Sequence, residues 1–121
     1  MSEKKLVMLV DDNPANLRIG KNVLSEKYIV ATVPSAEKLF NLLKNNHPVV
    51  ILLDIDMPEM DGYETIVALK SKPETKDIPV IFLTGMTDSS DEEKGRALGA
   101  VDYITKPFDP LSLITCIEKY L

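Results

Sequence analysis

Carboxylate side chains directly follow two of the short apolar runs in this 121-residue sequence. Asp11 and Asp12 follow the first run, Asp54 follows the third, and Asp56 comes two residues later. Carboxylates brought close together raise one another's pKa unless a cation compensates their charge. Oxygen donors of this kind favour magnesium, whereas one cysteine and one histidine cannot build a zinc site. The sequence therefore indicates an acidic site for a hard divalent cation.

A hydroxyl and an ammonium group complete this set of reactive side chains. Thr84 ends the fourth apolar run, and Lys106 stands shortly after the fifth. Ligands of open α/β sheets bind at the carboxyl ends of the strands, so we expect both side chains to lie near Asp54. A hard cation, a carboxylate nucleophile, a hydroxyl and an ammonium can move a phosphoryl group by positioning and charge neutralisation.

The elements that must position these residues alternate five times between strand and helix. The apolar runs predict strands at residues 6–10, 28–33, 49–53, 78–83 and 101–104. Near-continuous apolar runs are typical of parallel strands buried on both faces. The second and fifth runs are mixed and are expected at the edges of the sheet. The alternation predicts an α/β domain with a parallel sheet and helices on both faces, spanning residues 1–121.

Capping residues mark where the helices begin. Asn13-Pro14 and Asp109-Pro110 each place a capping side chain before a proline at the first helical position, and Ser35 is a further cap. Asp61 to Glu64 and Ser90 to Glu93 resemble capping boxes. The apolar positions predicted for the third and last helices are Tyr63, Ile66, Val67, Leu111, Ile114, Ile117 and Leu121.

The composition excludes several classes of protein. Fourteen basic and nineteen acidic residues give a net charge of −5, which disfavours direct nucleic-acid binding. The apolar run before Asp11 is too short for a signal peptide or a membrane span, so a cytoplasmic protein is expected. Cys116 has no cysteine partner in this chain and is expected to be a small buried apolar residue.

Four segments together resemble the receiver domain of two-component response regulators. They are Val10–Asn13, Leu53–Gly62, Leu83–Gly85 and Tyr103–Phe108, and the resemblance covers essentially the whole chain. Each segment is unspecific by itself, but the four in this order and spacing are specific. The resemblance implies a single doubly wound sheet of five parallel strands in the flavodoxin-like order 2-1-3-4-5, with five helices on its two faces.

The resemblance also implies a role for each acidic residue. Asp54 would accept a phosphoryl group from a phosphohistidine on a sensor histidine kinase or a histidine phosphotransfer protein. Mg²⁺ would be held by the carboxylates of Asp12 and Asp54, by Asp11 mostly through water, and by the backbone carbonyl of Asp56. Asp56 and Met86 would tune hydrolysis of the aspartyl phosphate. The domain would catalyse only its own Mg²⁺-dependent phosphotransfer and autodephosphorylation and would not be an enzyme in any wider sense.

The remaining site residues are also carried over from the resemblance. Lys106 would pair with the phosphoryl oxygens, Thr84 would turn its hydroxyl toward one of them, and Tyr103 would change rotamer with Thr84. Gly85 would offer its backbone N–H to the phosphoryl group, because glycine has no side chain to obstruct the approach. The peptide bond before Pro107 would be cis.

The output of such a domain would lie on the surface formed by the fourth helix, the fifth strand and the fifth helix. Phosphorylation would change this surface and so control a downstream protein or an output domain outside this chain. The same surface is a possible homodimer contact. No membrane association is expected.

Two alternatives use the same residues differently. Asp54-Ile55-Asp56 resembles the paired aspartates of haloacid-dehalogenase-like phosphatases, but that motif usually lies on the first strand, and here Met57-Pro58 follows it. A flavodoxin-like cofactor binder would need a phosphate-binding loop after the first strand, where Asp11-Asp12 would repel phosphate. A third alternative, a degenerate receiver that is not phosphorylated, is disfavoured because every residue type of the active site is present.

Overall fold

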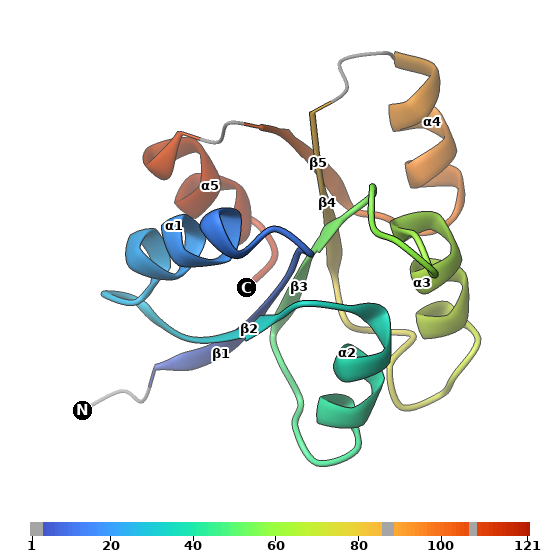
Figure 1. The fold of residues 1–121 in the computed structure, drawn as a ribbon, viewed down its shortest axis with the longest axis horizontal. Helices are drawn as coiled ribbons and strands as arrows, with labels where there is room; N and C mark the ends of the chain where they lie inside the picture. The colour runs from blue at the N-terminus through green and yellow to red at the C-terminus, as the bar shows by residue number, and fades with distance from the viewer. Residues whose placement is uncertain (1–3, 86–88, 107–108) are drawn as a thin grey trace.

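Strands and helices alternate along the whole chain, as Figure 1 shows. The computed structural model describes residues 4–85, 89–106 and 109–121, without the side chains of 89–91. The strands are β1 (Lys5–Val10), β2 (Tyr28–Val33), β3 (Val50–Asp54), β4 (Val80–Thr84) and β5 (Asp102–Thr105). The helices are α1 (Pro14–Leu24), α2 (Ala36–Leu43), α3 (Gly62–Lys70), α4 (Ser89–Ala97) and α5 (Pro110–Glu118).

The five strands form one parallel sheet in the order β2-β1-β3-β4-β5, which confirms the predicted order and the two edge strands. The strand register decides which residues meet at the carboxyl edge. Val10 is level with Leu53, so Asp11 follows β1 at the level of Asp54. Asp54 is level with Leu83, so Thr84 lies one residue beyond it on the neighbouring strand.

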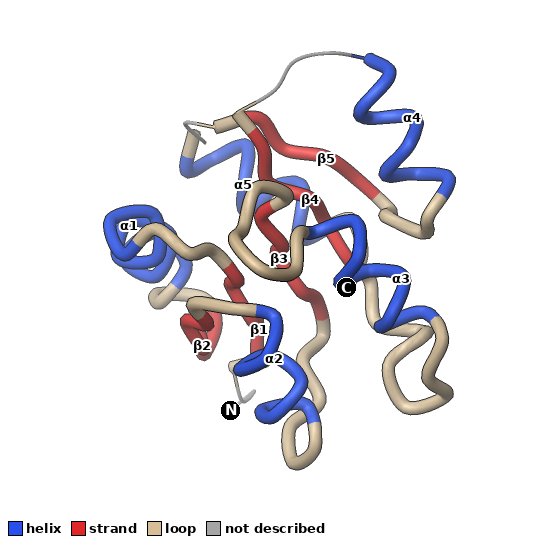
Figure 2. Tube along the Cα trace, turned by 45° about the vertical axis from the view of Figure 1, so that its right-hand side comes forward, coloured by secondary structure: helices blue, strands red, loops and turns tan. Residues whose placement is uncertain are grey.

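Two hydrophobic cores lie on opposite faces of the sheet. One core joins β1, β3 and β4 to α2 and α3 through residues such as Met8, Leu53 and Ile66. The other joins the opposite faces of the same strands to α1 and α5, through residues such as Leu24 and Ile117. Successive residues of a strand point to opposite faces, so strands buried on both sides must be apolar throughout. Figures 1 and 2 show the sheet between these two layers of helices.

Side-chain caps begin the helices at the predicted positions. Asn13 accepts a hydrogen bond from the Ala15 backbone N–H, which begins α1. Asp61 and Glu64 form a complete capping box at α3, which satisfies backbone donors that the helix leaves without partners. Ser35 and Asp109 likewise cap α2 and α5. The capping box predicted from Ser90 to Glu93 includes side chains outside the described part of the chain.

Three residues predicted on apolar helix faces are instead exposed. Leu111 is 72% exposed, Val67 51% and Leu121 46%. In α5 the buried residues are Leu113, Cys116 and Ile117, whose spacing of three and four places them on one face. Leu111 lies two residues from Leu113, roughly 200° around the helix, and so points to solvent. In α3, Ile66 and Leu69 occupy the buried face, and Val67 lies beside it.

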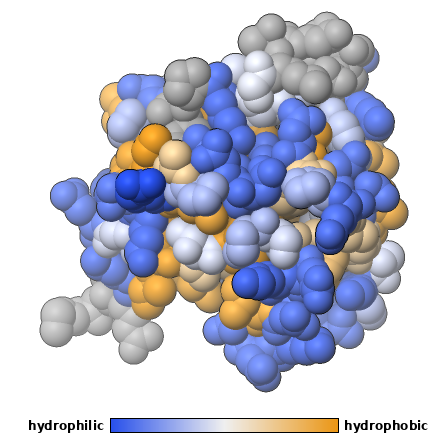
Figure 3. All heavy atoms as spheres, in the orientation of Figure 1, coloured by the Kyte–Doolittle hydropathy of each residue, from blue (hydrophilic) through white to orange (hydrophobic). Residues whose placement is uncertain are grey.

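The surface drawn in Figure 3 is mainly hydrophilic, and its apolar groups form small separate areas.

Cys116 is buried, as predicted. Among the described residues, no helix combines the length and the apolar character that a membrane span needs.

Candidate functional site

Three carboxylates converge at the carboxyl edge of the sheet. Asp11 and Asp12 follow the end of β1, and Asp54 is the last residue of β3. One carboxylate oxygen from each of the three lies within 4.8 Å of the others. Asp11 and Asp54 are buried, whereas Asp12 is exposed. The cluster predicted from the ends of the apolar runs is therefore present, with one carboxylate open to solvent.

Lys106 brings a positive charge into this acidic cluster. Its Nζ donates to Asp11 Oδ2 at 2.7 Å and to Asp54 Oδ1 at 3.0 Å. The Lys106 backbone N–H also donates to the Thr84 carbonyl at 2.6 Å, which holds the end of β5 against the end of β4. The lysine side chain is only 18% exposed, so these ion pairs are poorly screened by solvent.

Burial and charge shift the pKa values of this pair. Burial is the largest influence on Asp54 and, with the nearby Asp11 carboxylate, raises its pKa to about 6, although the hydrogen bond from Lys106 opposes the shift. Burial alone would lower the pKa of Lys106. The hydrogen bonds that Lys106 donates to Asp11 and Asp54 outweigh that effect, so its pKa is raised and the ammonium form is favoured.

The donor set fits a hard divalent cation. Three carboxylates, from Asp11, Asp12 and Asp54, face one ammonium group, so the cluster keeps a negative excess that a divalent cation would balance. All three side chains offer oxygen, which Mg²⁺ prefers. The Asp56 side chain is exposed and does not belong to this cluster. A metal contact through the Asp56 backbone carbonyl stays a prediction.

Thr84 and Tyr103 lie on neighbouring strands beside the cluster. Thr84 is fully buried at the end of β4. The Tyr103 ring on β5 packs edge to face against Phe82, with ring centroids 6.3 Å apart. Phe82 in turn contacts Tyr63 of α3, with a centroid separation of 5.6 Å. A change in the Tyr103 rotamer would therefore alter the packing of Phe82 and, through it, of Tyr63 on α3.

Gly85 lies directly beyond the end of β4, and its backbone contact with a phosphoryl group stays a prediction. Gly85 is exposed. A Cβ atom built at this position would meet no heavy atom within 4 Å, so the structure leaves room for alanine there. Met86 and Pro107, with its predicted cis bond, lie outside the described residues.

Gly62 is a positioning residue that the sequence reasoning missed. The loop after β3 turns back, and the Gly62 backbone N–H donates to the Ile55 carbonyl at 2.8 Å. A Cβ atom at Gly62 would lie 2.6 Å from the Asp54 carbonyl oxygen and 2.7 Å from the Ile55 Cα. The start of α3 thus packs directly on the backbone of Asp54. A glycine directly after the Asp61 cap, at the first position of α3, was the available signal.

Comparison with known proteins places this geometry in a family. Residues 7–118 match the family model described as "Response regulator receiver domain". A probable cyclic di-GMP phosphodiesterase of Vibrio cholerae is 43% identical over 101 residues, which are 84% of this chain but only 23% of that protein. The chain thus spans about a quarter of this curated relative. The match does not support the haloacid-dehalogenase alternative.

Two solved structures are similar over nearly the whole chain. The chemotaxis protein CheY4 of Vibrio cholerae superimposes with a TM-score of 0.93 at 27% identity, covering 98% of this chain and 100% of that one. The receiver domain of a sensor histidine kinase from Pseudomonas aeruginosa gives a TM-score of 0.89 at 25% identity, covering 98% of each chain. The second structure has a magnesium ion coordinated in its active-site cleft.

Proposed function

This chain belongs to the response regulator receiver domain family, whose members are phosphoacceptor signalling domains of two-component systems, and we propose that Asp54 is its acceptor. The observation that carries this assignment is the buried Asp54 carboxylate with the Lys106 ammonium 3.0 Å from Oδ1. Asp54 is also the only one of the three clustered carboxylates that lies within a central strand, between β1 and β4. We propose that the receiver domain comprises residues 1–121.

The proposed reaction is transfer of a phosphoryl group to a carboxylate oxygen of Asp54. The O–P bond forms as the N–P bond of the donor phosphohistidine breaks, and the histidine nitrogen keeps the bonding electron pair. The product brings about −1.5 to −2 of charge into a cluster that is already acidic. Lys106, which already contacts Asp54, would neutralise part of that charge. The Thr84 hydroxyl and the Gly85 backbone N–H would then contact the phosphoryl oxygens.

Asp12 and Asp54, with Asp11 mostly through water and the Asp56 carbonyl, would hold Mg²⁺. When bound, Mg²⁺ would neutralise charge on the phosphoryl oxygens during transfer. The exposed Asp12 leaves an approach from solvent, whereas Asp11 is already paired with Lys106. The same groups would support autodephosphorylation, which Asp56 and Met86 would tune.

We propose that α4, β5 and α5 form the output surface. Polar contacts join the three elements. The Arg96 guanidinium of α4 contacts Asp102 of β5 at 3.4 Å, and the Tyr120 hydroxyl beyond α5 donates to Asp102 at 2.8 Å. Movement of Thr84 toward a phosphoryl group would shift Tyr103 and favour one of two conformations of this surface. A downstream protein, an output domain or a second copy of the chain would respond to that change.

The proposed phosphoryl donor is a sensor histidine kinase or a histidine phosphotransfer protein. One of the similar structures is itself the receiver domain of a sensor histidine kinase, which supports this class of donor. Because such kinases take their phosphoryl group from ATP, the reaction is proposed to occur in the cytoplasm.

The test is the mass of the intact protein after incubation with acetyl phosphate and Mg²⁺. We expect one phosphoryl group on the wild type, none on Asp54→Asn, and none when Mg²⁺ is chelated. Asp56→Asn is the matched control, because its exposed side chain lies outside the carboxylate cluster, and it should still be phosphorylated. An adduct retained by Asp54→Asn would assign the acceptor to another residue.

A beryllium fluoride titration tests the assignment even if the aspartyl phosphate hydrolyses too rapidly to be detected. Beryllium fluoride mimics the phosphoryl group and is not hydrolysed. Saturable binding with Mg²⁺ to the wild type, and its loss in Asp54→Asn, would support the assignment even where no adduct accumulates. Failure of the wild type in both experiments would overturn the proposed phosphoacceptor role of Asp54.

A further inference from the structure

A hollow lies at the opposite edge of the sheet from Asp54. It is a pocket of about 210 Å³ between the C-terminal end of α2 and the loop that joins α3 to β4. Lys44 and His47 precede β3, and Lys72 and Glu74 precede β4, so these residues lie at the amino ends of the strands. Asp54 and Thr84 end the same two strands. A ligand in this pocket would leave the phosphoryl site accessible.

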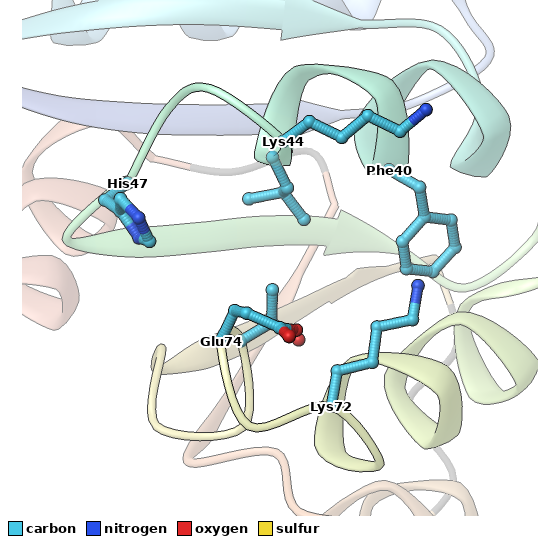
Figure 4. A pocket seen from close by; sticks show the side chains of 7 residues that line it. Phe40, Lys44, His47, Lys72 and Glu74 are labelled. Atoms are coloured by element: carbon cyan, nitrogen blue, oxygen red, sulfur yellow. The ribbon is translucent and has the colours of Figure 1, made fainter.

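The pocket combines an apolar floor with a charged rim. Phe40 and Leu43 of α2 supply the floor. The Lys72 Nζ lies 4.4 Å from the centroid of the Phe40 ring, a cation–π contact that holds the ammonium over the ring. In Figure 4 the side chains of Lys44 and Lys72 extend toward the Phe40 end of the pocket, and His47 lies at the other end.

The charge of the rim differs from that of the whole chain. The chain carries a net charge of −5, yet the rim has two ammonium groups, Lys44 and Lys72, and one carboxylate, Glu74. A locally positive rim on an acidic protein favours an anionic partner and disfavours a cationic one. The apolar floor requires that the partner also bring an apolar group.

The volume decides the class of ligand. Sites for drug-sized ligands and cofactors have volumes of roughly 300–1,000 Å³, and this pocket is smaller. It has room for one aliphatic or aromatic side chain, and its volume is below the usual range for a nucleotide or flavin site. Carboxylates that flank such a side chain would reach the lysines on the rim.

We infer that this pocket docks an acidic peptide segment of a partner protein. One apolar side chain of the segment lies against Leu43, beside the Lys72–Phe40 pair, and neighbouring carboxylates pair with Lys44 and Lys72. Docking at this edge is independent of the chemistry proposed for Asp54. It therefore offers a contact that the partner can keep in either phosphorylation state.

The test is a titration of the ¹⁵N-labelled protein with the capped tripeptide Glu-Leu-Glu, followed by amide chemical shifts. We expect saturable shifts centred on Phe40, Leu43 and Thr75, and weakening when salt is added. Lys72→Gln and Lys44→Gln should each weaken binding about two- to five-fold, as expected for exposed ion pairs. Glu74→Gln should strengthen it by a similar factor, because it removes the repulsive carboxylate. Lys21→Gln, an exposed lysine on α1, is the control and should change nothing.

Several results would overturn the inference. Equal binding of Lys-Leu-Lys would exclude a role for the positive rim, and equal binding of Glu-Ala-Glu would exclude insertion of an apolar side chain. Tighter binding of isovalerate than of the tripeptide would assign the pocket to a small carboxylic acid. Self-association that Lys72→Gln abolishes would assign it to a second copy of the chain. All variants change exposed side chains, and their unliganded spectra will verify that the fold is intact.

Discussion

The Lys106 ammonium lies 3.0 Å from Asp54 Oδ1, although the two residues are 52 positions apart in the sequence. The same ammonium lies 2.7 Å from Asp11 Oδ2, so one lysine bridges the ends of β1 and β3. The positive charge is therefore in place before any phosphoryl group arrives. A preorganised charge of this kind costs little reorganisation when the reaction occurs.

Gly62→Ala tests whether the start of α3 positions Asp54. The added Cβ would lie 2.6 Å from the Asp54 carbonyl oxygen, so the backbone must shift. We expect a loss of about 1–3 kcal/mol in the free energy of unfolding, as for other overpacked sites, measured by urea denaturation. The yield of phosphorylated protein with acetyl phosphate should also fall.

Gly85→Ala is the matched control for that variant. A Cβ at Gly85 would meet nothing within 4 Å, and alanine keeps the backbone N–H. We expect wild-type stability and phosphorylation. If Gly62→Ala were as well tolerated as Gly85→Ala, the proposed packing of α3 on the Asp54 backbone would be wrong.

Magnesium should stabilise the folded protein through the carboxylate cluster. A ligand at one hundred times its Kd that binds only the folded state adds about 2.7 kcal/mol to the free energy of unfolding. Asp12→Asn should remove most of this gain, because it deletes the exposed carboxylate of the cluster. Asp56→Asn should keep most of it, since only its backbone carbonyl is proposed as a ligand. Thermal unfolding with and without Mg²⁺ measures the stabilisation in each variant. If Asp12→Asn and Asp56→Asn lost the same amount of this stabilisation, the proposed ligand set would be contradicted.

The raised pKa of Asp54 predicts a pH-dependent stability of the metal-free protein. The folded-state pKa of about 6 exceeds the ordinary 3.8, so the folded state binds this proton more tightly than the unfolded state does. The stabilisation is complete below about pH 4 and is lost as the pH rises through about 6. Asp54→Asn cannot ionise there, so near neutral pH it should exceed the wild type in unfolding free energy by on the order of 3 kcal/mol.

Urea denaturation in a chelating buffer at several pH values will measure this difference. Asp56→Asn provides the exposed-carboxylate control and should follow the wild-type pH profile. If the free energy of unfolding changed with pH in the same way for the wild type and Asp54→Asn, ionisation of Asp54 would not destabilise the folded protein.

Cys116 should be an unreactive thiol. Burial is the main cause that raises its pKa to about 11, and the neighbouring Asp102 carboxylate adds to the shift. A shift of two units from the usual 9 lowers the thiolate fraction about 100-fold at mildly alkaline pH. Iodoacetamide should therefore alkylate Cys116 at least about 100-fold more slowly in the folded protein than in the protein unfolded in urea. Asp102→Asn should accelerate the reaction and Lys119→Gln should slow it, and a reversal of these signs would refute the electrostatic explanation.

The elements and the candidate site residues could be predicted because their signals are local. Apolar runs of strand length, and caps such as Asn13 and Asp61, act on residues only a few positions away. The convergence of Asp11 and Asp54 followed from the strand order that the resemblance implied, because adjacent parallel strands end at one edge of the sheet. The acidic site, its hydroxyl and its lysine were therefore predictable before the fold was seen.

Other properties depended on packing between distant segments. The sequence did not show which of Asp11 and Asp12 is buried, that Lys106 bridges two carboxylates, or that Leu111 faces solvent. Nor did it show that Gly62 lies on the Asp54 backbone, or that Lys72 covers Phe40 from another loop. Sequence patterns report the preferences of neighbouring residues. Burial, ion pairing and close backbone contact depend on how the helices cover the sheet, so the tertiary structure alone decided them.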